Sequence, residues 1–70
     1  MTTFEIAGDF IALHKLLKAA GLCGTGGAAK LAVEAGEVEV DGEVERSRGR
    51  KVRPGQVVRF RGEELRVQAM

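Results

Sequence analysis

The sequence contains one cysteine, one histidine, three phenylalanines and no tryptophan or tyrosine. A single thiol cannot form a disulfide within the chain, so the cysteine content does not indicate an oxidising compartment. One Cys and one His fall short of the three or four ligands of a zinc site. Neither Cys23 nor His14 has an evident catalytic partner. Cys23 is expected to be a small buried residue and His14 a surface or edge residue. We therefore expect no catalytic residue, metal or cofactor, and no enzyme.

Long apolar runs are also missing. No stretch approaches the roughly 20 residues needed to span a bilayer. The first ten residues, MTTFEIAGDF, do not place an apolar run after a basic region, so no secretory signal peptide is expected. The expectation is a cytoplasmic protein without membrane contact.

The length of 70 residues corresponds to one domain, expected to span residues 1–70. A chain of this size buries only about 60% of its unfolded surface, so its core must be small. Nothing in the sequence requires a dimer, and a monomer is expected. Because aromatic residues are few, Leu, Val, Ile and Ala must build the core, and Phe4, Phe10 and Phe60 are expected to join it.

The net charge of +1 hides a separation of charge along the chain. An acidic block without bases comprises Glu34, Glu37, Glu39, Asp41, Glu43 and Glu45. A basic block without acids follows, comprising Arg46, Arg48, Arg50, Lys51, Arg53, Arg59 and Arg61. Such asymmetry indicates a surface that binds a polyanion, although two solvated surfaces explain it equally well.

Two helices are predicted in the first half of the chain. Asp9 is a suitable N-cap for the first, and apolar residues recur at helical spacing at Phe10, Leu13, Leu16, Leu17 and Ala20 before the stop at Gly21. Thr25 caps the second, which runs to about Ala35 and ends at Gly36. The second helix has small residues for close packing at Ala28, Ala29, Ala32 and Ala35, beside Leu31.

Short strands surround these helices. Alternation predicts a strand over residues 3–7, and after Gly36 the apolar period changes from helical to two. Asp41-Gly42 predicts a hairpin with Val44 on its return strand, Pro54-Gly55 a turn, and strands follow at Val58–Phe60 and Leu65–Val67. Helices grouped before strands predict an α+β fold, with two N-terminal helices packed on a small antiparallel sheet of about four to five short strands.

Gly26 and Gly27 lie in the first turn of the second predicted helix, where glycine costs roughly 1 kcal/mol each relative to alanine. One interpretation is that they leave the first N–H groups open to a phosphate. The other is that they permit close packing against the first helix. The sequence favours neither. A nucleotide-binding phosphate loop is not expected, because the GxxxxGK[ST] spacing is missing.

Residues 10–60 resemble the S-four RNA-binding domain, also called the alpha-L motif. The family pattern has LDKLL and GL in and after a first helix, Ser-Arg opening a second, and then A, LI, G, V, V and NG. The matching segments are His14–Leu17, Gly21-Leu22, Thr25 to Gly42 and Lys51–Gln56. Ala12, His14, Gly26 and Asp41 depart from that pattern. The size and the glycine after Thr25 resemble the short, free-standing bacterial branch of the YbcJ-like type.

The resemblance implies a protein that binds structured RNA, ribosomal or transfer RNA, on a ribosomal particle or beside a protein partner. The RNA-binding residues would be Lys15, Lys18, Thr25, Gly26, Gly27, Lys30, Arg46, Arg48, Arg50, Lys51 and Arg53. Binding through the RNA backbone is expected, and stacking on unpaired bases is not, since the phenylalanines are assigned to the core. The alternative is a protein-interaction module on the same fold that has lost RNA contacts.

Overall fold

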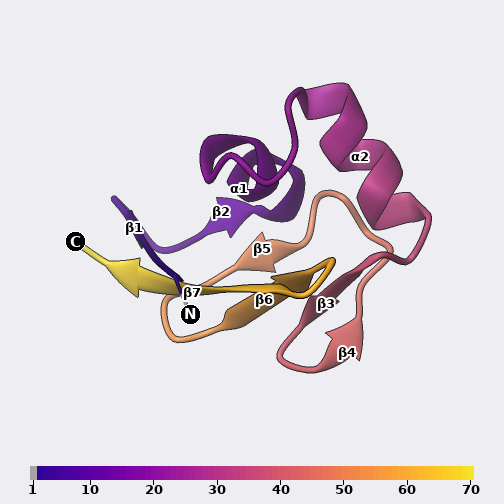
Figure 1. The fold of residues 1–70 in the computed structure, drawn as a ribbon. Coiled ribbons are helices and arrows are strands. Elements are labelled where there is room, and N and C mark those ends of the chain that lie inside the picture. Colours follow the sequence, from indigo (N-terminus) through magenta and orange to yellow (C-terminus); the bar gives the residue numbers. More distant parts are fainter. Residues whose placement is uncertain (1) are drawn as a thin grey trace.

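The computed structural model describes residues 2–70 and shows an α+β fold, as predicted. Two helices lie on one side of a five-stranded sheet, and a two-stranded sheet joins the first helix to the later part of the chain (Figure 1). The elements are β1 (Thr2–Ile6), β2 (Ile11–Ala12), α1 (Leu13–Ala19), α2 (Gly26–Glu34), β3 (Val38–Val40), β4 (Glu43–Val44), β5 (Lys51–Val52), β6 (Val57–Phe60) and β7 (Glu63–Ala69).

The strands of the larger sheet are ordered β1-β7-β6-β3-β4, and β2 pairs with β5 in the smaller one. Four strands of the larger sheet are antiparallel, as predicted, but β1 pairs with β7 in parallel. The sheet is therefore mixed. Alternation within a strand shows which side chains share a face and not which direction the neighbouring strand runs. The parallel pair joins the two ends of the described chain, with both helices in the connection.

The first helix begins at Leu13 and not after Asp9, so the predicted cap is wrong. Ile11 lies in β2, where it pairs with Val52, so the chain is still extended at this point. The first helical N–H groups then find partners across the fold. The Leu13 N–H donates to the Arg50 carbonyl (2.8 Å) and the His14 N–H to the Arg48 carbonyl (3.1 Å). These long-range bonds replace the side-chain cap that an isolated helix would need.

The second helix follows the prediction. The Thr25 hydroxyl accepts a hydrogen bond from the Ala28 N–H at 3.0 Å, which satisfies one otherwise unpaired donor. Gly36, at φ +80°, ends the helix in the left-handed region. Its N–H bonds to the Val33 carbonyl and the next N–H bonds to Ala32, the pattern of a Schellman motif. Gly21 ends α1 in the same way, at φ +78°.

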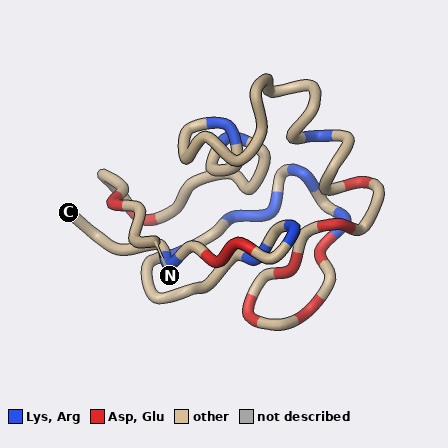
Figure 2. Tube along the Cα trace, viewed as in Figure 1, with Lys and Arg blue, Asp and Glu red and all other residues tan. Residues whose placement is uncertain are grey.

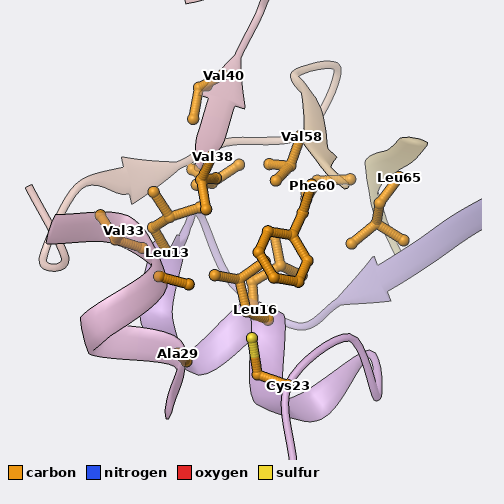
Figure 3. Close-up of a cluster of buried hydrophobic side chains, with 14 of the residues drawn as sticks. Leu13, Leu16, Cys23, Ala29, Val33, Val38, Val40, Val58, Phe60 and Leu65 are labelled. Atoms are coloured by element: carbon orange, nitrogen blue, oxygen red, sulfur yellow. The ribbon is translucent and has the colours of Figure 1, made fainter. Parts of the chain in front are cut away.

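The core lies between the helices and the sheet (Figure 3). The fully buried Leu and Val side chains are Leu13, Leu16, Leu17, Val33, Val38, Val52, Val58 and Val67. Removing a side chain of this size from water contributes about 1.5–3 kcal/mol. Cys23 is buried beside them, as predicted, and desolvation raises the pKa of its thiol.

Only one face of α2 is packed. Ala29, Ala32 and Val33 are buried, whereas Leu31 is 68% exposed. Ala28 and Ala35 are exposed as well, so Ala29 and Ala32 are the small residues through which this helix packs closely. The helix meets α1 along a narrow stripe and leaves an apolar side open.

The hairpin between β3 and β4 has the predicted two-residue turn, with Asp41 at φ 52° and Gly42 at φ 85°. The Asp41 carboxylate accepts hydrogen bonds from the Val57 N–H (2.9 Å) and the Gln56 side-chain amide (3.2 Å). A residue where the family pattern has Asn thus fastens the hairpin to the start of β6. Across residues 2–70, no helix is long and apolar enough to cross a membrane.

Candidate nucleic-acid interface

The predicted basic residues lie on α1, α2 and the chain from β4 through β5, and acidic residues gather around the β3–β4 hairpin (Figure 2). The two charge blocks meet in space. Nη1 of Arg48 lies 3.5 Å from Oε2 of Glu34, and Nη1 of Arg50 lies 2.6 Å from Oε1 of Glu45. A third pair joins Arg61 and Glu37 at 2.9 Å. Folding therefore neutralises part of the charge separation that the sequence displays.

Arg50 makes the tightest of these contacts. Its hydrogen bond, together with one from the Ser47 backbone N–H at 3.1 Å, lowers the pKa of the Glu45 carboxyl. The backbone carbonyls of Arg48 and Arg50 are held by α1, and Nδ1 of His14 donates to the Arg48 carbonyl at 2.8 Å. His14 is partly exposed at the edge of the helix, as predicted. The chain from 45 to 50 is thus fixed against α1 by both backbone and side-chain bonds.

Arg46 lies at the C-terminal end of α2. Its guanidinium donates to the Glu34 carbonyl at 3.5 Å and crosses Gly36, where a Cβ would come within 2.7 Å of it. A cation is favourable beside the negative end of a helix. The nine residues of α2 span about 13 Å, so Arg46 is far from Gly26 and Gly27 at the other end. The predicted surface is therefore extended and not one compact patch.

The two glycines that open α2 are not needed for packing. A Cβ on Gly26 would meet no atom within 4 Å, and one on Gly27 would meet only the Thr25 hydroxyl at 4.0 Å. The interpretation based on close packing against α1 is therefore wrong. Thr25 itself has a structural role as the helix cap. The first turn contains no acidic residue that would compete with an anion.

Besides Arg46, whose guanidinium donates to the Glu34 backbone carbonyl, five of the predicted basic side chains have no acidic partner within 4.0 Å among residues 2–70. They are Lys15, Lys18, Lys30, Lys51 and Arg53. All are exposed except Lys30, which is half-buried. Lys51 stands on β5, opposite Ala12 of β2, which leads directly into α1. Lys51 and Arg53 are therefore placed on the side of the molecule that carries α1.

Phe10 is 44% exposed, so its predicted place in the core is wrong. The Lys51 ammonium lies 4.9 Å and the Arg53 guanidinium carbon 6.0 Å from the centre of its ring. Sequence reasoning missed this aromatic residue beside two cations. One signal was present, because Phe10 and Ile11 are adjacent and neighbouring side chains of an extended segment face opposite ways.

Nothing in the described part of the chain resembles a metal centre. No group of three or more His, Cys, Asp or Glu side chains there is placed to hold an ion. The groups in this region that suit an anion are the basic side chains without acidic partners and the exposed first turn of α2.

Comparison with known proteins agrees with the fold. A family model described as the S4 domain matches residues 4–68. The Escherichia coli (strain K12) protein named "Putative RNA-binding protein YbcJ" is 39% identical over 70 residues, covering 99% of this chain and 100% of that protein. The YbcJ protein of Shigella flexneri has the same identity and coverage.

A solved structure is similar as well. The solution structure of YbcJ from E. coli, described as revealing an alpha-L motif involved in RNA binding, superposes with a TM-score of 0.77 and 38% identity. The superposition covers 99% of this chain and 89% of that one. The similarity extends beyond the residues 10–60 on which the sequence resemblance was based. Since the family model and the relatives span nearly the whole sequence, the chain belongs to the S4 domain family.

Proposed function

We propose that this protein binds structured RNA, ribosomal or transfer RNA, as one RNA-binding domain over residues 1–70. The observation that carries the proposal is the group of five basic side chains on α1, α2 and the β5 segment that have no acidic partner among residues 2–70. Membership of the S4 domain family adds support. So do the RNA-binding name of the E. coli relative and the description of its structure.

Backbone contacts supply most of the proposed affinity. Lys15, Lys18 and Lys30 act as point charges toward phosphates, and Lys51 and Arg53 extend the surface along β5. The first turn of α2, at Gly26 and Gly27, offers N–H groups to a further phosphate.

The remaining arginines of the proposed surface have a dual role. Arg46, Arg48 and Arg50 hold the chain after the hairpin against Glu34 and Glu45. A guanidinium has five N–H donors, and Arg48 and Arg50 each contact their carboxylate through Nη1. Both arginines therefore retain donors for phosphate without releasing their carboxylates.

The test is a binding titration of the wild-type chain with ribosomal RNA fragments and transfer RNA over a range of salt. Neutralising about four phosphates makes log K fall with log salt at a slope of roughly −3 to −4. A flat salt response would exclude a phosphate-based interface. Failure to bind any structured RNA would refute the proposed function.

A second candidate is a protein-interaction module, favoured by a groove between α2 and β6. Its lining includes Leu22, Leu31, Phe60 and Arg61, and Leu31 is the most exposed large apolar side chain of the helices. A Leu31→Gln substitution, which makes the groove polar and adds no charge beside Lys30, distinguishes the two candidates. It should leave RNA affinity unchanged if RNA binds the basic side chains, and should abolish association with a protein that occupies the groove.

The proposed setting is the bacterial cytoplasm, with the monomer acting on a ribosomal particle. The bacterial sources of both YbcJ relatives support it. The check is whether the protein co-sediments with ribosomal subunits from a bacterial lysate and is released by high salt. Sedimentation of the protein only at the top of the gradient would contradict the ribosomal part of the proposal.

A further inference from the structure

Phe10 occupies an exposed and well-defined position. It directly precedes β2, whose pairing of Ile11 with Val52 and Ala12 with Lys51 anchors the neighbouring backbone. The chain then enters α1, whose first N–H groups are bonded to the 48–50 segment. The backbone directly after Phe10 is therefore held in place by a strand pair and a helix, and this fixes the position of the ring.

The ring is only partly covered by its neighbours. The 44% exposure of Phe10 remains with Lys51 and Arg53 in place beside it. Neither cation has an acidic partner within 4.0 Å in residues 2–70, so the contact with the ring leaves their charge free. Phe60, in contrast, is buried, and Phe4 is partly buried against the core. Phe10 is the exposed aromatic side chain of the described residues.

We propose that Phe10, Lys51 and Arg53 form a stacking site for one unpaired nucleobase of the bound RNA. This inference rests on the proposed RNA-binding function and specifies which part of an RNA that surface takes. An aromatic ring stacks on the face of any base, and the two cations bind the phosphates on either side of it. A base held in a duplex has both faces occupied by its neighbours, so a loop, a bulge or a strand end is required.

The absence of Trp and Tyr makes this site directly observable. In a Phe10→Trp variant, all tryptophan fluorescence comes from position 10. The probes are two RNA hairpins with the same number of base pairs and the same non-nucleotide linker closing the stem. One carries a single unpaired bulged nucleotide, and the other is fully paired. Val44→Trp is the matched control, because Val44 is 55% exposed on the acidic hairpin. Thermal unfolding of each variant verifies that it folds.

We expect the bulged hairpin to quench the fluorescence of Phe10→Trp more strongly than the paired one, and neither to quench Val44→Trp. A Phe10→Leu variant keeps an apolar side chain without a ring. It should bind the bulged hairpin roughly 5- to 150-fold more weakly than wild type, the loss expected for one stacked base, and retain its salt dependence.

Three results would overturn the inference. One is wild-type affinity for the bulged hairpin in Phe10→Leu, and another is equal quenching by both hairpins. In either case RNA binding by the wild-type chain would still support the proposed function, and only the stacking site would be lost. The third is absence of binding by the wild-type chain to both hairpins and to ribosomal and transfer RNA, which would refute the proposed function and the stacking site together.

Discussion

Replacing Lys51 and Arg53 with glutamine tests which cations contact RNA. Neither side chain has an acidic partner within 4.0 Å in residues 2–70, so the double variant breaks no ion pair there. Each phosphate contact contributes about 0.9 to the slope of log K against log salt. Losing two contacts should therefore make the slope shallower by about 1.8. If the affinities converge near 1 M salt, the variant binds about 30-fold more weakly at about 0.15 M.

The assay is fluorescence anisotropy of a labelled RNA at five or more salt concentrations. A matched control is Arg59→Gln with Arg66→Gln, which removes the same charge. These two side chains alternate with the buried residues Val58, Leu65 and Val67, so they lie on the face of the sheet opposite the helices. The control should keep the wild-type slope. An unchanged slope in the Lys51 and Arg53 variant, or an equal loss in the control, would refute the assignment of the interface to this side.

Three further predictions concern stability. Thr25→Ala removes the cap of α2 and should lower the free energy of unfolding by about 1 kcal/mol in urea denaturation, while Thr25→Ser should lower it much less. Leu16→Ala, at a fully buried site, should lower the free energy of unfolding by about 2–5 kcal/mol. Leu31→Ala, at an exposed site, should change it by no more than about 0.5 kcal/mol. Equal losses in the two variants would contradict the assigned burial. The lowered pKa of Glu45 means that its pairing with Arg50 stabilises the fold fully above the ordinary carboxyl value of 4.5 and loses effect as the pH falls through the folded value. The stability difference between wild type and Arg50→Gln should therefore be smaller at about pH 3 than at about pH 7, and a difference that grows on acidification would show that the pair does not act this way.

The features that sequence reasoning predicted correctly depend on residues close together in the chain. The Thr25 cap and the Gly36 stop define α2, and Asp41-Gly42 forms the turn between β3 and β4. Each requires a particular side chain or a left-handed backbone at one position. Periodicity identified the buried faces for the same reason, because the repeat of a helix or strand is a local property.

The features that the sequence did not predict correctly depend on contacts between distant segments of the chain. Pairing of β2 with β5 moved the start of α1 to Leu13 and left Phe10 outside the core. The parallel pairing of β1 and β7 joins the two ends of the described chain. Neither leaves a local signal, since the partner lies tens of residues away.

Charge shows the same division. The sequence by itself determined how many cations the chain has and that they follow an acidic block. Only the tertiary structure decided that Arg48 and Arg50 face Glu34 and Glu45, while Lys51 and Arg53 lie beside Phe10 with no carboxylate of residues 2–70 within 4.0 Å. The reason is physical, because the strength of an ion pair depends on distance in space and its surroundings. Sequence order placed the opposite charges in separate blocks, and folding brought some of them together.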